Sequence, residues 1–189
     1  MARGRKRKAG KRHPSGKLIQ PRLEETQREV MSTVLEARQR HFGVSERQAK
    51  DERLGTALGR LAFVGAITLS QYAAGELYGE TMARHRAVVG LPMAQPRSVT
   101  GLLINEGIFG ASPSEPVLEV IDNVKRRYGD ATAALADCDR EQRLSPGRPP
   151  TFVVYRMICA DEDVQHWDAD DIGNLRVALN ALVRVFRLR

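Results

Sequence analysis

The side chains with the clearest chemistry lie in a basic run at the start of the sequence. The first 22 residues hold nine lysines and arginines, and the first carboxylate belongs to Glu24. Such cations neutralise nucleic-acid phosphates and release condensed counterions, which gives strong, salt-sensitive binding that ignores base sequence. We therefore expect a nucleic acid, DNA in preference to RNA, to bind this tail. The expected contacts are Arg3, Arg5, Lys6, Arg7, Lys8, Lys11, Arg12 and Lys17.

This basic tail carries the whole positive excess of the chain. Among 189 residues, 30 Lys or Arg and 23 Asp or Glu give a net charge of +7, so without the nine tail cations the rest carries −2. No apolar residue lies between Ala9 and Leu18, and such a block cannot bury enough surface to repay the entropy of ordering. We predict that residues 1–21 are disordered alone. A solubilising role and attraction to an anionic membrane are the alternatives.

A second group of polar side chains follows one face of a predicted helix near the C-terminal end of the sequence. Arg176, Asn180, Arg184 and Arg187 follow one another at intervals of four, four and three residues. Arg and Asn are the side chains that pair bidentately with guanine and adenine edges in the major groove. The pattern fits a groove-reading helix. The alternative is a solvated face whose arginines lie favourably near a helix C-terminus.

Three short segments also resemble parts of DNA-binding motifs. Arg3-Gly4-Arg5 and Gly147-Arg148-Pro149 each hold part of the Arg-Gly-Arg-Pro core of a minor-groove arm. The run Phe42-Gly43-Val44-Ser45 resembles the turn of a helix-turn-helix motif. In that case the groove-facing residues would be Glu46, Arg47, Lys50 and Arg53. Basic loops and an ordinary helix junction are the alternatives.

The remaining polar residues predict no catalytic or metal centre. Acids are dense in residues 161–171, but this segment lacks the glycine and the terminal glutamate of a calcium loop, and charges at helix ends explain it better. Cys138 and Cys159 match no zinc spacing, so we expect reduced thiols. No phosphate-binding glycine loop or nucleophile motif occurs. We expect no enzyme, no cofactor, no membrane span and no secretory signal.

Apolar periodicity and capping patterns predict an all-α protein of six or seven helices. A first helix over 22–41 should face inward through Leu23, Val30, Val34 and Ala37. The S-x-x-Q box at Ser45 should begin a second helix that continues to Gly65, and the T-x-x-Q box at Thr68 should turn a central hairpin into a helix over 69–89. Gly75 and Gly79 should let a neighbouring backbone approach that helix.

The later part of the sequence predicts a C-terminal helical bundle. Helices are expected from Ser114 to Arg143, with a break at Gly129 left open, then over 150–160, where a strand over 151–155 is the alternative, and over 169–187. The last helix should turn one apolar stripe inward: Ile172, Leu175, Leu179, Leu182, Val183 and Phe186. We therefore divide the chain into a tail (1–21), an N-terminal helical half (22–92), a connector (93–114) and a C-terminal helical half (115–189).

Some phrases of the sequence resemble a known group of proteins. Gly65-Ala-Ile67-Thr68 with Gln71-Tyr72-Ala-Ala-Gly75, and Leu175-Arg176-Val-Ala178-Leu179 with Leu182, resemble small, largely uncharacterised proteins encoded by phages and prophages. The resemblance spans most of residues 35–187. The same segment is also similar to a helical domain of some bacterial transcription regulators. It implies a DNA-binding regulator of transcription in the bacterial cytoplasm, with RNA polymerase as a further partner. A packaging component such as a small terminase subunit, an RNA-binding protein and a homo-oligomer remain alternatives.

Overall fold

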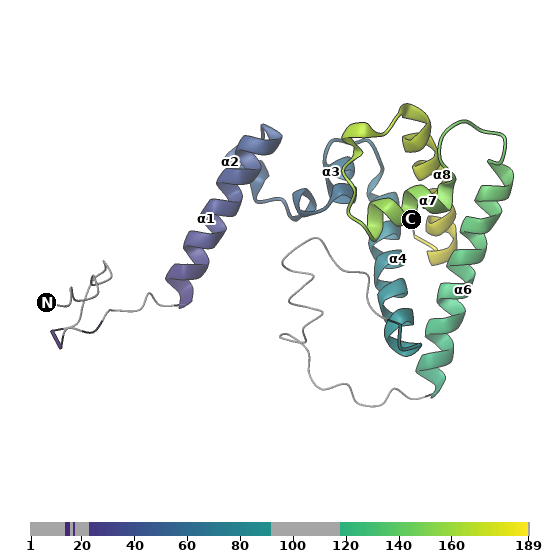
Figure 1. Cartoon of the computed structure of the whole chain (residues 1–189), viewed down its shortest axis with the longest axis horizontal. Helices are drawn as coiled ribbons and strands as arrows, with labels where there is room; N and C mark the ends of the chain where they lie inside the picture. The colour runs from purple at the N-terminus through teal and green to yellow at the C-terminus, as the bar shows by residue number, and fades with distance from the viewer. Residues whose placement is uncertain (1–13, 16, 18–22, 92–117, 189) are drawn as a thin grey trace, which may run out of the picture. The chain divides into compact units, whose positions relative to one another are not determined.

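The computed structural model describes residues 14, 15, 17, 23–91 and 118–188, and most of these residues are helical (Figure 1). Seven α-helices and two 3-10 turns occur in this part of the chain, and no strand does, which confirms the predicted all-α class. The helices are α1 (Leu23–Phe42), α2 (Glu46–Ala49), α3 (Ala57–Phe63), α4 (Leu69–Val88), α6 (Leu118–Glu141), α7 (Pro150–Ile158) and α8 (Ala169–Phe186). The turns are η1 (Glu52–Gly55) and η2 (Val164–His166).

The chain forms two compact units, Met1–Asp51 and Glu52–Arg189. In the first unit α1 ends as predicted, because Gly43 adopts a φ of +63°, which a residue with a side chain rarely adopts. The predicted capping box is also present: Ser45 N donates to Gln48 Oε1 at 3.0 Å, and the backbone N–H of Gln48 donates to Ser45 Oγ at 3.4 Å. Arg38 Nη1 donates to the carbonyl of Ala49 at 3.1 Å, which holds α2 against α1.

Two predictions for this region are wrong. The face of α1 expected to point inward is exposed, because Val30 is 59 % exposed, Val34 is 40 % exposed, and Ala37 is exposed too. Periodicity identifies an apolar face but not what covers it. The side chain of Leu23 lies outside the described residues.

The long helix predicted from Ser45 to Gly65 is instead three pieces, α2, η1 and α3. Thr56 Oγ1 accepts from the N–H of Gly59 at 3.0 Å, and Asp161 Oδ1 accepts from the N–H of Ala57 at 2.7 Å, so a new helix starts there. A Cβ at Gly59 would lie 2.0 Å from the carbonyl oxygen of Arg53, so the chain folds back too tightly for any larger residue.

The central hairpin joins α3 to α4 as predicted. Gly65 has a φ of +75°, Thr68 Oγ1 accepts from the N–H of Gln71 at 3.1 Å, and Gln71 Oε1 accepts from the N–H of Thr68 at 2.8 Å. Ile67, the residue before the cap, is only 4 % exposed and belongs to the core. The two reciprocal hydrogen bonds and the apolar residue beside them fix the angle at which the chain enters α4.

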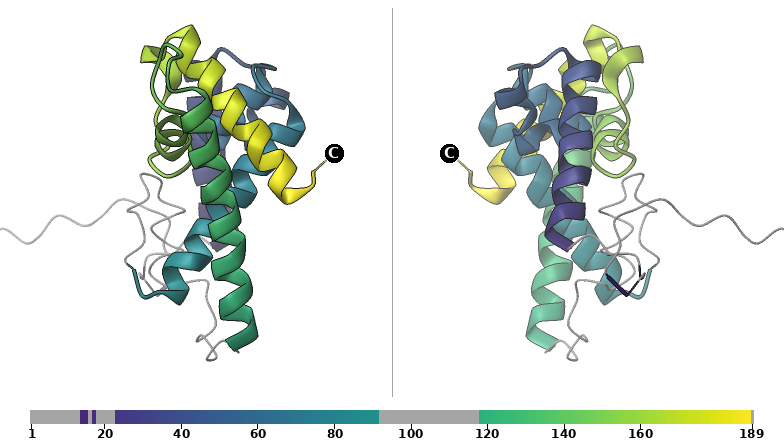
Figure 2. Two further views of the ribbon diagram at one scale, coloured as in Figure 1. Left: turned by 90° about the vertical axis from the view of Figure 1, so that its right-hand side faces the viewer. Right: turned by 90° about the vertical axis from the view of Figure 1, so that its left-hand side faces the viewer.

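The core of the second unit lies among α3, α4, α6, α7 and α8, and α8 crosses both α4 and α6 (Figure 2). The predicted stripe of α8 supplies its centre, since Leu175, Leu179 and Leu182 are fully buried. Small residues allow this packing: a Cβ at Gly75 would lie 2.5 Å from Leu58 Cδ2. Helix α6 runs through Gly129 without a break, and the predicted connector 93–114 lies outside the described residues.

Candidate nucleic-acid interface

Of the tail residues predicted to contact nucleic acid, only Lys17 is among the described residues, and it is exposed. The other seven lie outside them. They are Arg3, Arg5, Lys6, Arg7, Lys8, Lys11 and Arg12. The Arg3-Gly4-Arg5 arm lies there too, so the structural argument for binding rests on the second unit.

The four polar residues predicted on one face of the last helix are all exposed, but only three lie on α8, because Arg187 follows its end with a φ of +55°. Arg176 Nε donates to the carbonyl oxygen of Ala66 at 2.7 Å, and Asn180 Oδ1 accepts from Gln71 Nε2 at 2.9 Å. Both bonds fasten α8 to the turn of the central hairpin. Arg176 and Asn180 therefore have a structural role, and the C-terminal pair, Arg184 and Arg187, is freer to meet a ligand.

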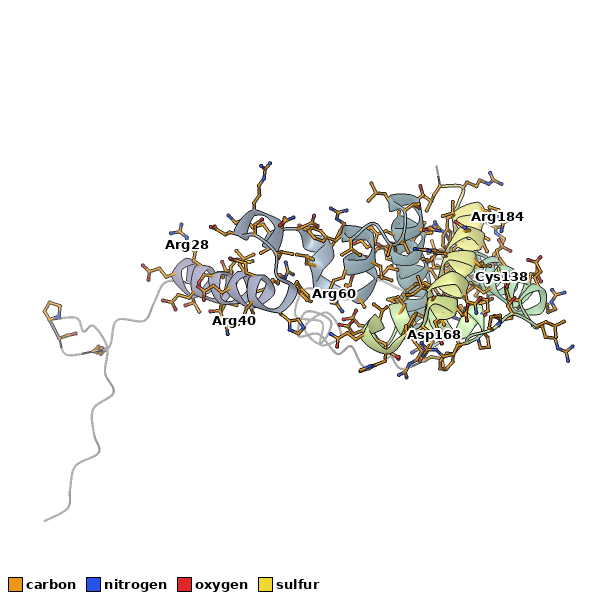
Figure 3. The ribbon with its side chains drawn as sticks, turned by 90° about the horizontal axis from the view of Figure 1, so that it is seen from above. Arg28, Arg40, Arg60, Cys138, Asp168 and Arg184 are labelled. Atoms are coloured by element: carbon orange, nitrogen blue, oxygen red, sulfur yellow. The ribbon has the colours of Figure 1, made fainter. Side chains whose placement is uncertain are left out.

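Arg187 lines a hollow between the end of α8 and the middle of α6. The hollow has a volume of about 310 Å³ and is lined by Asn123, Arg126, Arg127, Asp130, Val185, Phe186 and Arg187. The guanidinium of Arg127 lies 5.2 Å from the centre of the Phe186 ring, a cation–π contact that holds this arginine at the wall. Figure 3 marks Arg184 on the same end of α8.

A second hollow lies next to the first, between α6 and α4. Its volume is about 200 Å³, and it is lined by Thr81, Arg84, Val120, Asn123, Val124 and Arg127. Asn123 and Arg127 line both hollows, so the two form one concave surface that spans three helices. We call Arg84, Arg126, Arg127 and Arg187 the Arg127 cluster. The amide of Asn123 accepts a hydrogen bond from Arg126, which orients that guanidinium.

Most arginines of this cluster differ from the ion-paired arginines of the second unit. Arg60 pairs with Asp163 at 3.2 Å, and Arg148 pairs with Asp171 at 2.7 Å. By contrast, within residues 23–91 and 118–188 no ion pair joins Arg126, Arg127 or Arg187 to a carboxylate, although Asp130 lines the first hollow.

The fourth arginine of the cluster, Arg84, reaches Glu80 in an exposed pair at 3.4 Å, and such pairs contribute little because water screens them. The two hollows thus carry excess positive charge, and the geometry suits a multiply charged anion such as a phosphodiester backbone. Sequence reasoning missed this surface, although the run Lys125-Arg126-Arg127 was a visible signal.

The minor-groove interpretation of Gly147-Arg148-Pro149 is wrong, because the half-buried Arg148 is bound to neighbouring side chains. Its Nε and its backbone N–H both donate to the Asp171 carboxylate at 2.8 Å, and its guanidinium lies 4.6 Å from the centre of the Trp167 ring. These hydrogen bonds raise the pKa of Arg148 and lower that of Asp171. The Arg148 side chain is therefore not available to enter a DNA minor groove.

The helix-turn-helix interpretation of Phe42 to Ser45 is also wrong. The helix after that turn, α2, has only four residues and ends at Ala49, so it is too short to lie in a major groove. Lys50 Nζ lies 3.3 Å from Glu46 Oε1, which pairs two of the expected groove-facing residues with each other.

The acidic side chains of residues 161–171 stabilise the fold. Asp168 caps α8, Asp163 pairs with Arg60, and Glu162 contacts Arg156 and accepts from Trp167 Nε1 at 3.0 Å. Within the described residues no three His, Cys, Asp or Glu side chains are placed to share a metal ion.

Both cysteines are free thiols. Burial raises the pKa of Cys159 to about 11 and also raises that of Cys138, so both stay protonated near neutral pH. Among the helices of the described ranges, none has the length and hydropathy that crossing a bilayer requires. In comparisons with known proteins, no family model matches this chain, and neither a curated protein nor a solved structure is significantly similar to it.

Proposed function

We propose that the protein binds nucleic acid, preferentially double-stranded DNA, through its basic tail and the Arg127 cluster. The observation that carries the proposal is the distribution of charge. Cations are concentrated in a tail without acids and in two adjacent hollows where, among the described residues, no carboxylate pairs with Arg126, Arg127 or Arg187, whereas half-buried arginines such as Arg60, Arg148 and Arg156 pair with acids. The tail supplies sequence-independent affinity, and the cluster positions the duplex against the helical body.

The resemblance to phage and prophage proteins supports a more specific role. We infer a regulator of transcription in the cytoplasm of a bacterial host, which brings the nucleic acid into contact with RNA polymerase. Base recognition in such a regulator would come from Arg184 and Arg187, because Arg176 and Asn180 are engaged with the central hairpin. The proposal therefore differs from the sequence-based prediction, in which all four polar side chains of the last helix contact bases.

The test is a salt titration of DNA binding, measured by fluorescence anisotropy on a labelled duplex. Each phosphate neutralised adds about 0.9 to the slope of log affinity against log salt. Deleting residues 1–17 should remove most of the affinity, and Arg126→Gln with Arg127→Gln in the full chain should lower the slope by about two. The matched control is Arg140→Gln with Arg143→Gln, which removes the same charge from the other end of α6 and from the turn after it.

The control separates a local contact from the general effect of net charge. We expect the control variant to retain the wild-type slope. Unchanged affinity after the tail deletion would refute the role of the tail. Equal losses in the two double variants would show that the Arg127 cluster is no contact site. Tighter binding of a matched RNA duplex would identify RNA as the ligand and overturn the preference for DNA.

A further inference from the structure

Helix α1 presents an apolar strip that nothing else in its own unit covers. Val30 and Met31 are 59 % and 58 % exposed, and Val34 is 40 % exposed. Val30, Val34 and Ala37 follow at intervals of four and three residues, so they lie on one side of the helix. The helix α2 contacts α1 near its C-terminal end, where Arg38 bonds the carbonyls of Ala49 and Asp51, and it leaves the middle of α1 open.

The charges of α1 are divided along its length. Residues 23–32 hold three glutamates and one arginine, a formal charge of −2, whereas residues 33–42 hold one glutamate and two arginines, a charge of +1. Glu29 and Arg40 are eleven residues apart, which is close to three helical turns, so both lie along the same edge of the strip. Arg28 and Arg40 emerge on different sides of α1 (Figure 3).

We propose that α1 pairs with α1 of a second copy of this chain in antiparallel orientation. Centring the pair between Thr33 and Val34 places Val30 of one copy opposite Ala37 of the other, which removes the exposed strip from water. In this register the acidic half of each copy, residues 23–32, lies beside the basic half of the other, and Arg40 lies about 3 Å along the axis from the level of Glu29. A parallel pair in register would instead place the two acidic halves side by side. Charge complementarity therefore selects both the partner and the orientation.

The pairing would give one assembly two basic tails. A second tail that binds the same duplex does so at a high effective concentration, which raises overall affinity without any new contact. The pairing itself does not depend on nucleic acid, so it can be measured in its absence. Failure of DNA binding and failure of this proposal are therefore distinguishable.

The experiment measures the mass of the full chain by sedimentation equilibrium, free of nucleic acid. We expect a species of twice the 21.0 kDa chain mass. Val30→Asp with Val34→Asp places four carboxylates at the centre of the pair and should give monomers. The matched control is Val64→Asp with Leu69→Asp, at two positions of the second unit that are 71 % and 65 % exposed, and this variant should stay dimeric.

A charge exchange tests the orientation and does not depend on the apolar positions. Glu29→Arg places two arginines side by side at each end of an antiparallel pair, and should raise the dimer dissociation constant about tenfold. Adding Arg40→Glu restores opposite charges and should recover the wild-type constant. A wild-type chain that sediments as a monomer would overturn the proposal. This result is expected if residues 52–189 of the same chain cover the strip. So would a dimer that survives Val30→Asp with Val34→Asp, or a charge exchange without recovery.

Discussion

Replacing Asp171 by Asn should destabilise the second unit through one well-defined change. The Asp171 side chain is 6 % exposed, accepts two hydrogen bonds from Arg148, one from Nε and one from its backbone N–H, and forms an ion pair with Nη2 at 2.7 Å. Asn keeps the shape but removes the charge and turns one N–H group towards these donors. Hydrogen bonds to charged groups contribute about 1.5–3 kcal/mol each. Because a third of the Arg148 side chain meets water, we expect a loss of about 2–3 kcal/mol.

Urea denaturation followed by circular dichroism measures this loss. For a slope of about 2 kcal/mol per molar urea, the midpoint should fall by roughly 1–1.5 M. The matched control is Asp170→Asn, one residue earlier in the first turn of α8 and exposed, which should cost no more than about 0.5 kcal/mol. Equal midpoints for the Asp171 variant and the wild type would refute the view that this ion pair anchors the 146–150 loop to α8.

The same pair predicts a pH dependence with a definite sign. Hydrogen bonding to Arg148 holds the pKa of Asp171 below its ordinary value of 3.8. A carboxyl whose pKa is lowered by folding contributes stability above its unfolded pKa and loses it as the pH falls through the folded value. The difference in unfolding free energy between wild type and Asp171→Asn should therefore be full at pH 7 and shrink below pH 4. A difference that stays constant down to pH 2 would contradict this assignment.

Two further predictions concern the helices that carry the candidate interface. Thr68→Ala removes the side-chain cap of α4 and should lower the free energy of unfolding by about 1 kcal/mol in a denaturant titration, whereas an unchanged midpoint would contradict the capping role. Gly129→Ala should raise stability by up to about 1 kcal/mol, because a Cβ there meets nothing within 4 Å, while Gly75→Ala should lower it by about 1–3 kcal/mol through the clash with Leu58. If both glycine variants raise the free energy of unfolding, helix propensity and not packing determines the effect of an added Cβ at these positions.

Local signals in the sequence were enough to locate most helices. The caps at Ser45, Thr68 and Asp168 depend on neighbours three residues away, and all three are present in the structure. The break before α3 was not predictable in this way, because it depends partly on Asp161, which lies 104 residues from its partner Ala57. The exposure of Val30 and Val34 was missed for the related reason that periodicity does not identify a covering element.

The candidate interface was predictable only in part. Arg184 lies exposed on α8 as expected, but Arg187 caps the end of the helix in a left-handed conformation, and its neighbours Arg126 and Arg127 come from a helix that only tertiary packing brings close. Arg148 was misassigned because its partners Glu162 and Asp171 follow it by 14 and 23 residues, and a loop arginine looks the same in sequence with or without them. Residue type gives the chemistry, but burial and partners decide which cations remain available.

The contacts between the central hairpin and the later helices also determine the order in which this protein can fold. Ala57, Ala66 and Gln71 bond residues 104, 110 and 109 positions further along the chain. During synthesis the hairpin therefore leaves the ribosome well before Asp161, Arg176 and Asn180 exist to complete it. Contacts of such sequence separation slow folding, and they leave apolar faces such as that of Ala74 and Tyr78 open in the meantime. A nascent chain interrupted before α8 would thus be a substrate for chaperones or proteases and not a smaller folded domain.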